Sequence, residues 1–167
     1  MEKLPYLNTD RLTLVTFTVD MMKAILIGKN QLSKITNYQV ADEYPMKVYK
    51  QLLPYKIERF AQYPEENKWE GVIIHKRDNT IMADIGFKGG PDEKGEMDLG
   101  YSVVPRYQGH GYATEMTIAM VDWGLKQDNV KKITASCSRS NLPSIRVLEK
   151  AGLKQIGIKD NEIYWST

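Results

Sequence analysis

The chain has little of the side-chain chemistry on which many metal and redox sites depend. Cys137 is the single cysteine among 167 residues. This excludes an intrachain disulfide framework and a zinc site built from several cysteines. The two histidines, His75 and His110, lie far apart in the sequence, so we do not expect a histidine-based metal site either. We therefore expect a protein that holds no metal.

The chain also lacks a strong charge bias and a long hydrophobic run. Its 23 basic and 21 acidic residues give a net charge of +2, which provides no electrostatic footprint for nucleic acid or a membrane surface. The apolar runs are far too short to form a membrane-spanning helix. Residues 1–5 lack the apolar core of a signal peptide. We expect a cytoplasmic protein with no nucleic-acid or membrane partner.

What is present fits one globular domain spanning residues 1–167, because 42% of the residues are hydrophobic and 26% are charged. There is no internal repeat, low-complexity tract or linker-like segment. Residues 11–17 alternate polar and apolar side chains and predict a strand. Thr18 or Asp20 is expected to cap the helix that follows, and a second helix is expected over 48–63.

From residue 69 onward, strand and helix signals alternate. Residues 111–126 are apolar around most of the helical circumference and predict a largely buried helix. Strand, helix, strand, helix and strand follow an antiparallel run of strands. We therefore expect an α/β (α+β) fold with a mixed, mostly antiparallel sheet of about seven strands. The strands of this half are expected at 69–75, 81–87, 96–104, 132–138, 153–158 and 162–165, and a further helix begins at 141–143.

The most informative stretch is 103–114, VVPRYQGHGYAT. A strand ends there, Gly109 and Gly111 follow with one residue between them, and a helix begins. Glycines let backbone N–H groups point into one concavity, and the helix adds its unpaired N–H groups and positive dipole end. Such a loop binds phosphate or pyrophosphate. The alternative is a tight turn without a ligand. The sequence fits neither a P-loop nor a dinucleotide fingerprint, whose third glycine would fall at Thr114.

Residues 108–113, QGHGYA, resemble the acyl-CoA pyrophosphate motif of the GNAT superfamily of N-acetyltransferases. Residues 99–105, LGYSVVP, resemble the strand that leads into this motif, and NLPS with VLEKAGL at 141–153 resembles the family's second helix. TDRLTL at 9–14 resembles the opening strand of the RimJ/RimL branch, which acetylates N-terminal amines of ribosomal proteins. Residues 29–68, where the family has its substrate-binding helices, contain no motif that adds to the resemblance.

The resemblance implies a single GNAT-like domain with helices on both faces of the sheet. It also implies a splayed pair of parallel strands, ending at Val104 and near Ser138, with acetyl-CoA as co-substrate in the gap between them. Asn141 would hydrogen-bond the pantetheine arm. Backbone groups of Ser102, Val103 and Val104 would pair with pantetheine and polarise the thioester carbonyl, and the amides of Gln108, Gly109, His110, Gly111, Tyr112, Ala113 and Thr114 would hold the pyrophosphate.

Acetyl transfer to an amine makes its own demands. Alkyl amines have pKa values of about 8–10, so a group must accept a proton, directly or through water. Asp98 is the first candidate, because it shares a strand face with Ser102 and Val104, and Glu96 is the second. The alternative for both is an exposed carboxylate at the start of a strand. The RimJ/RimL branch usually has glutamate at the position of Asp98, so the shorter side chain reaches less far.

The leaving thiolate also needs a proton. Ser144 matches the serine of the branch's Asn-x-x-Ser pattern and is the candidate donor, unless it is an ordinary serine in the first turn of a helix. Many family members use a tyrosine four residues later, but Leu148 stands there. Ser144 or solvent is then left to protonate the thiolate.

Other reactive side chains fit structural roles better. Cys137 alternates with apolar residues and predicts a buried thiol rather than a nucleophile. His75 is expected at the surface, and His110 is expected to face solvent or phosphate. Neither histidine has a partner for a catalytic triad. The tyrosines of the first half either line a substrate groove or, as we favour, cover a core.

The leading hypothesis is an enzyme that transfers acetyl from acetyl-CoA to a primary amine by direct attack in a ternary complex. The acceptor is either a protein N-terminus or a small-molecule amine. The alternatives are a non-catalytic acyl-CoA-binding module that acts as a sensor or interaction subunit, and a domain that binds a phosphate ligand other than CoA. Either a monomer or a homodimer is compatible with the sequence.

Overall fold

The computed structural model describes residues 6–167. They form two compact units. Unit 1 holds the described part of 1–86 together with 101–112, and unit 2 holds 87–100 together with 113–167. Strand β6 (Glu96–Val103) and helix α4 (Tyr112–Leu125) each contribute residues to both units.

The strands of unit 1 form an antiparallel ladder in the order β1, β2, β4, β5. A short strand, β3, pairs in parallel with the start of β5. Every residue of β4 and β5 is buried, so these two strands form the centre of the unit's core. The strands are β1 (Leu7–Asn8), β2 (Leu12–Thr16), β3 (Gln39–Val40), β4 (Glu70–His75) and β5 (Thr80–Phe87).

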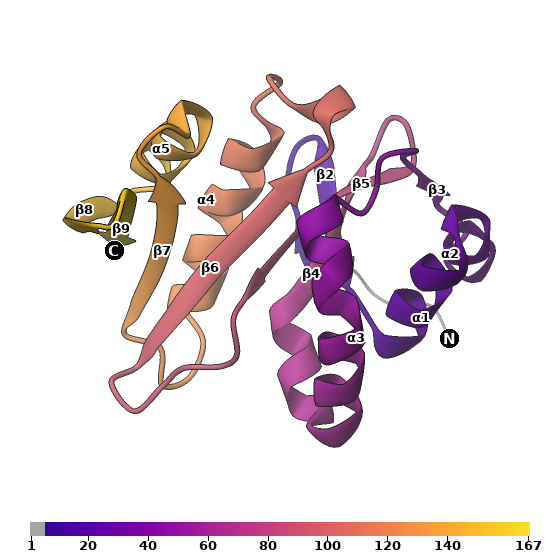
Figure 1. Cartoon of the computed structure of the whole chain (residues 1–167), viewed down its shortest axis with the longest axis horizontal. Coiled ribbons are helices and arrows are strands. Elements are labelled where there is room, and N and C mark those ends of the chain that lie inside the picture. The colour runs from indigo at the N-terminus through magenta and orange to yellow at the C-terminus, as the bar shows by residue number, and fades with distance from the viewer. Residues whose placement is uncertain (1–5) are drawn as a thin grey trace. The chain divides into compact units, whose positions relative to one another are not determined.

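Helices cover part of this sheet. The Thr18 hydroxyl accepts a hydrogen bond from the Met21 N–H and caps α1, as one of the two predicted caps. α1 packs against α2 and α3, and α3 lies against β4 (Figure 1). The helices are α1 (Val19–Ile27), α2 (Lys29–Thr36) and α3 (Lys47–Gln62), followed by the 3₁₀ helix η1 (Pro64–Trp69).

Unit 2 contains the parallel strand pair. β6 pairs with β7 (Lys132–Ser138) only from Glu96 opposite Lys132 to Asp98 opposite Thr134, although β7 continues to Ser138. On its other edge β7 pairs along most of its length with β9, which in turn pairs with β8. The remaining elements are α5 (Leu142–Lys150), β8 (Lys154–Lys159) and β9 (Glu162–Ser166).

Helix α4 is only partly buried, which corrects the expectation of a largely buried helix. Gly124 allows close packing, since a Cβ there would lie 2.7 Å from Phe87 and 2.8 Å from Ile133. Ile118 and Leu125, by contrast, are 47% and 39% exposed. The helix therefore presents one packed face, while apolar residues at other angles stay at the surface.

The predicted fold class is confirmed. The structure is mixed α/β, it contains the parallel pair β6–β7, and its predicted strands and helices lie within a few residues of their expected bounds. The described residues contain nine strands rather than about seven, because the two-residue strands β1 and β3 have no periodic signal. Within residues 6–167, no helix is long and apolar enough to cross a membrane.

Candidate functional site

The loop between β6 and α4 has the backbone that the sequence predicts. Gly109 and Gly111 have φ angles of +79° and +81°, which lie in the left-handed region that glycine adopts without strain. A Cβ on Gly109 would meet nothing within 4 Å, so the backbone angle rather than packing requires glycine there. The loop leads directly into α4, whose first N–H groups have no carbonyl partner within the helix. This geometry suits a phosphate group.

Arg11, the residue directly before β2, contacts this loop. Its guanidinium Nη1 donates to the His110 carbonyl oxygen at 2.9 Å, and its Cζ lies 4.5 Å from the centroid of the Tyr112 ring. A Cβ on Gly111 would lie 3.4 Å from the Arg11 guanidinium. The opening strand and the glycine loop are thus joined within unit 1, although about 100 residues separate them in the sequence.

His75 is buried, which corrects the expectation of a surface histidine. Its Nε2 lies 2.9 Å from the Tyr112 hydroxyl, and its Nδ1 accepts from the Asp78 N–H at 3.2 Å. The Tyr107 hydroxyl donates to the Asp78 carboxylate at 2.8 Å. His75 therefore links the β4–β5 turn to both ends of the loop. Tyr107 and Tyr112 come from a distant segment, so the local sequence gives no sign of this role.

The backbone groups at the end of β6 alternate between facing β5 and facing away from it. The Val104 N–H donates to the Met82 carbonyl at 3.1 Å, so Val104 and Ser102 direct their backbone groups toward β5. Alternation then directs those of Val103 away from β5. The Gln108 side-chain amide donates to the Val103 carbonyl at 2.8 Å. The Val103 N–H is thus the backbone donor that faces away from the unit 1 sheet.

The predicted proton acceptors lie at the start of β6, in unit 2. The Asp98 carboxylate forms an ion pair with Lys88 Nζ at 3.0 Å and accepts a hydrogen bond from the Thr134 hydroxyl at 2.9 Å. Its side chain is 37% exposed. Glu96 is half-buried beside the first rung of the β6–β7 ladder. Both oxygens of Asp98 are therefore engaged with other residues of unit 2.

Asn141 and Ser144 lie at the beginning of α5. The Asn141 side-chain oxygen accepts from the Ser144 N–H at 3.2 Å and caps the helix. The Asn141 side chain is exposed, and its amide nitrogen carries the two donors that a ligand carbonyl needs. Ser144 is half-buried, as are Ala113 and Thr114 in the first turn of α4. The predicted site residues therefore divide between the units, with Ser102, Val103, Val104 and 108–112 in unit 1 and the others in unit 2.

Sequence reasoning missed a group of buried polar residues in unit 1. We call it the buried acidic cluster and define it as Tyr44, Tyr49, Lys56, Glu70, Asp84 and Ser102. Glu70 and Asp84 are only 4% and 2% exposed. Lys56 Nζ donates to Glu70 at 3.0 Å, and the Ser102 hydroxyl donates to Asp84 at 3.0 Å. One signal was available: Asp84 interrupts an apolar run, Ile-Met-Ala-Asp-Ile, in the middle of a predicted strand.

The cluster perturbs the ionisation of its members. Burial, reinforced by the negative charge of Glu70, raises the pKa of Asp84 to about 8. Burial, followed by the charges of Asp84 and Glu70, also raises the pKa of the Tyr44 hydroxyl well above its ordinary value. Asp84 is thus a carboxyl group that exchanges its proton in the range where enzymes operate.

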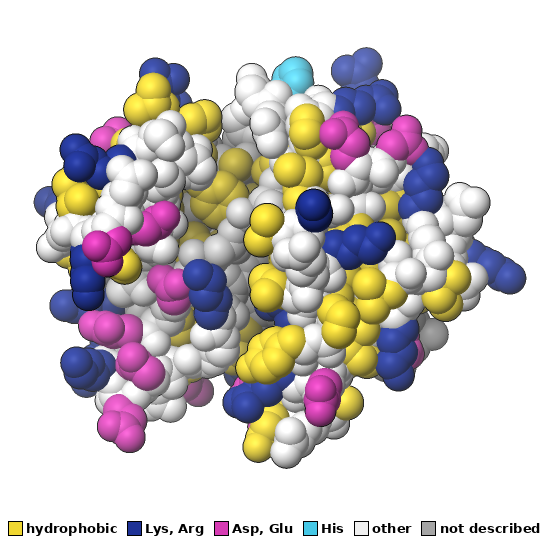
Figure 2. All heavy atoms as spheres, in the orientation of Figure 1, with side chains coloured by type: hydrophobic (Ala, Val, Ile, Leu, Met, Phe, Trp, Pro, Cys, Tyr) yellow, Lys and Arg dark blue, Asp and Glu magenta, His cyan; other side chains and the backbone are white. Residues whose placement is uncertain are grey.

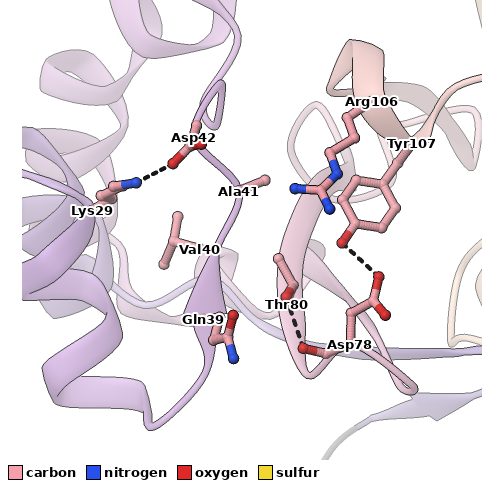
Figure 3. Close-up of a pocket in the computed structure, with 9 residues that line it drawn as sticks. All are labelled: Lys29, Gln39, Val40, Ala41, Asp42, Asp78, Thr80, Arg106 and Tyr107. Atoms are coloured by element: carbon pink, nitrogen blue, oxygen red, sulfur yellow. Dashed lines mark hydrogen bonds and ion pairs between the residues drawn. The ribbon is translucent and has the colours of Figure 1, made fainter.

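Two cavities open within unit 1. One, of about 480 Å³, lies between β3, the turn before β5 and the 3₁₀ helix η2 (Pro105–Tyr107). Figure 3 shows the Arg106 guanidinium extending into it, with the Lys29–Asp42 ion pair on the opposite side. The other, of about 620 Å³, adjoins the glycine loop and is lined by Asp10, Arg11, His75, Lys76, Arg77, Asp78, Arg106, Tyr107, His110 and Tyr112.

The face of the molecule that Figure 2 draws has no large region of one charge sign. On the face drawn in Figure 2, basic and acidic side chains are interspersed. Among the described residues, no group of three or more His, Cys, Asp or Glu side chains could hold a metal ion. Cys137 is buried, as expected of a structural thiol.

Comparison with known proteins identifies the chain's relatives. A family model described as an acetyltransferase (GNAT) domain matches residues 11–154. The chain is 31% identical over 147 residues to YjdG, an uncharacterized N-acetyltransferase of Bacillus subtilis strain 168. The aligned residues cover 87% of this chain and 88% of the relative.

Solved structures share the fold. RimL, the ribosomal L7/L12 alpha-N-protein acetyltransferase solved in complex with coenzyme A, superimposes with a TM-score of 0.70 at 14% identity and covers 99% of this chain and 97% of its own. A GNAT-family acetyltransferase from Bacillus anthracis superimposes with a TM-score of 0.65 at 20% identity, covering 96% of each chain.

Proposed function

The chain belongs to the GNAT family of acetyltransferases, and from this premise we propose that it transfers acetyl from acetyl-CoA to a primary amine by direct attack in a ternary complex. The observation that carries this proposal is the loop with left-handed Gly109 and Gly111, beside a cavity lined by four basic and two acidic side chains. Backbone donors and nearby cations together suit the pyrophosphate of CoA.

The proposed contacts to acetyl-CoA follow the order of its parts. The backbone amides of residues 108–114 hold the pyrophosphate. The exposed amide nitrogen of Asn141 donates to a carbonyl of the pantetheine arm. The Val103 N–H, which faces away from β5, donates to the thioester carbonyl and stabilises the oxyanion of the tetrahedral intermediate. Ser102 and Val104, the residues on either side of Val103, flank this contact.

Ser144 is the proposed donor of a proton to the departing CoA thiolate. It stands in the first turn of α5, where the helix N-terminus favours negative charge on a nearby sulfur. Leu148, one turn later, is buried and apolar, so α5 offers no tyrosine for this step. Replacing Ser144 with alanine is expected to lower kcat and to leave the Kd of acetyl-CoA unchanged.

We place the enzyme with the RimJ/RimL branch, which suggests a peptide or protein N-terminus as acceptor. The 480 Å³ cavity supports this choice over a polyamine, because its four charged side chains, Lys29, Asp42, Asp78 and Arg106, balance in sign. A polycation would need an acidic surplus there. An acceptor with a free amine and a neighbouring carbonyl or carboxylate would instead pair with Arg106.

The test is release of CoA thiol from acetyl-CoA across a panel of N-terminal peptides, amino acids, polyamines and aminoglycosides. Acceptor-dependent release, with a mass gain of one acetyl group on the amine, is the expected result. Tight binding of acetyl-CoA without release on any acceptor would favour the non-catalytic binding module. Absence of acetyl-CoA binding would contradict the proposal.

A matched pair of variants tests the loop itself. Gly89 has a φ angle of +81° and open space around it, like Gly109, but lies in the β5–β6 connection. Gly109→Ala and Gly89→Ala should each lose about 1–2 kcal/mol of stability from left-handed strain. Only Gly109→Ala should weaken acetyl-CoA binding, by roughly tenfold, which corresponds to one lost backbone contact. Equal affinities of the two variants would show that the loop does not hold the ligand.

A further inference from the structure

The buried acidic cluster contains two carboxyl groups, Glu70 and Asp84, but a single cation, Lys56. Glu70 accepts hydrogen bonds from Lys56 on one oxygen and from the Tyr49 hydroxyl on the other. Asp84 accepts from the Ser102 hydroxyl through Oδ1 and has the Tyr44 hydroxyl as a second neutral neighbour, but among the described residues no cation forms an ion pair with it. Lys56 is the cation of this cluster, and it forms its ion pair with Glu70. Asp84 must therefore either carry a proton or exist as an unpaired buried charge.

The geometry of the sheet explains how these groups meet. Asp84 pairs across the β4–β5 ladder with Val72, so Glu70 is its diagonal neighbour on the same face. The hydrogen bond from Ser102 extends this row from β5 to β6. Tyr49 and Lys56 reach Glu70 from α3, which covers this face. The row connects a buried carboxyl group to the strand segment proposed to carry the thioester.

A buried carboxyl group without a cation is costly, and a methionine or leucine at position 84 would pack without that cost. The tyrosines, the lysine and the serine hydroxyl around Asp84 do not remove its excess charge. Groups with such perturbed ionisation concentrate at functional sites. Asp98, by comparison, is ion-paired to Lys88 and half exposed, so its charge is already compensated.

Building on the proposed function, we propose that the Ser102–Asp84 pair, rather than Asp98, receives the proton that the acceptor amine loses during acetyl transfer. The amine nitrogen attacks the thioester carbonyl, and a C–N bond forms. A proton from this nitrogen passes to the Ser102 hydroxyl oxygen as the hydroxyl's own proton passes to the Asp84 carboxylate. The C–S bond then breaks, and CoA leaves as a thiolate that is protonated from Ser144 or water. Asp84 then returns its proton to solvent, and Ser144 takes one back from solvent if it has protonated the thiolate, so the enzyme returns to its starting state.

In this scheme Ser102 touches the amine, and Asp84 acts through Ser102. The raised pKa of Asp84 supports the scheme, because a proton acceptor works best when its pKa is close to the operating pH. Burial and the charge of Glu70 raise the pKa of Asp84, while the hydroxyl groups of Ser102 and Tyr44 and the charge of Lys56 lower it. The carboxylate form that accepts the proton therefore becomes populated as the pH approaches about 8.

The experiment compares four variants of the full chain, Asp84→Asn, Ser102→Ala, Asp98→Asn and Asp122→Asn, with the acceptor that reacts fastest in the thiol-release panel. Asp122 is a surface residue of α4 and controls for the loss of one carboxylate. Asn at position 84 has the shape of the protonated acid and keeps an oxygen for the Ser102 hydrogen bond, so we expect it to fold. The Kd of acetyl-CoA and the dependence of kcat on pH are measured for each variant.

Asp84→Asn is expected to lower kcat by about 10²–10³-fold and to leave the Kd of acetyl-CoA unchanged. It should also abolish the rise of kcat with pH that the wild-type chain shows near pH 8, where Asp84 ionises. Ser102→Ala should lower kcat as well, and Asp122→Asn should retain it.

A purely structural role for Asp84 would lower stability and leave the pH profile intact. An intact profile in Asp84→Asn, or loss of the inflection in Asp98→Asn instead, would overturn the proposal. Failure of acetyl transfer by the wild-type chain would refute the proposed function itself.

Discussion

Asp84 and Asp98 each accept a hydrogen bond from a serine or threonine hydroxyl group, and they differ in their exposure and in their charged neighbours. Asp84 accepts from Ser102 at 3.0 Å and is 2% exposed. Asp98 accepts from Thr134 at 2.9 Å, is 37% exposed and pairs with Lys88. A hydroxyl hydrogen bond alone therefore does not determine what a carboxyl group does. The presence of a cation and of water decides whether it stays a fixed charge or exchanges a proton.

Removing the cation of the buried acidic cluster should have the largest effect on stability. Lys56→Met leaves Glu70 as an uncompensated charge beside Asp84 and is expected to cost about 3–5 kcal/mol of unfolding free energy. The measurement is urea unfolding at pH 7. A loss below 1 kcal/mol would mean that the cluster is hydrated rather than dry.

The pH dependence of stability should separate the two aspartates next. The folded-state pKa of Asp84, about 8, lies above the unfolded value near 4, so the folded chain binds the extra proton more tightly. The free energy of unfolding should therefore fall as pH rises from about 4 to about 8. Asp84→Asn removes this fall and should be more stable than wild type at pH 9, by a few kcal/mol, since each pKa unit corresponds to about 1.4 kcal/mol.

Urea unfolding of both proteins at pH 4.5 and pH 9 checks this expectation. The two should be about equally stable at the lower pH, because Asp84 is then protonated and resembles asparagine. If the difference between them were the same at both pH values, Asp84 would not titrate in this range.

Removing the hydroxyl group of Ser102 or of Thr134 should change stability in two different ways. Because the Ser102 hydrogen bond lowers the Asp84 pKa, Ser102→Ala should raise that pKa and cost stability mainly above pH 8. Thr134→Val should cost about 1 kcal/mol at every pH, the ordinary value of one hydrogen bond. Thermal unfolding at pH 6 and pH 9 distinguishes these patterns. Equal losses at both pH values in Ser102→Ala would count against the titration of Asp84.

The smallest effect should come from Lys88→Met. Both members of the Lys88–Asp98 pair are partly exposed, so water and salt screen their attraction. We expect a loss of at most about 1 kcal/mol, which decreases further at high ionic strength. Urea unfolding at low and high salt provides the measurement. A loss comparable to that of Lys56→Met would remove the distinction between the two aspartates.

The fold and the glycine loop could be predicted because their signals are local. Alternation of apolar residues locates the strands, and Gly109 and Gly111 mark a turn whose left-handed φ angles need glycine. The role of His75 could not be predicted, because Tyr107 and Tyr112 reach it from segments about 30 residues away or more. Its burial depends on tertiary contacts that no periodicity records.

The buried acidic cluster was predictable only in part. An aspartate within an apolar strand is an anomaly, and Asp84 could have been singled out on that ground. Its partners could not, because Lys56 and Tyr49 come from a helix in a segment that carries no recognisable motif. The sequence favours Asp98 as the proton acceptor instead, because Asp98 lies beside a recognised motif. Its ion pair with Lys88 became visible only in the structure.

The most direct test of the contrast is a pH titration of the chain labelled with ¹³C at the aspartate carboxyl carbons and followed by NMR. The account predicts one aspartate that titrates near pH 8, and this signal should be absent from Asp84→Asn and present in Asp98→Asn. If every aspartate titrates near or below the ordinary pKa of about 4, Asp84 is a fixed charge, and the proposed path for the proton is contradicted.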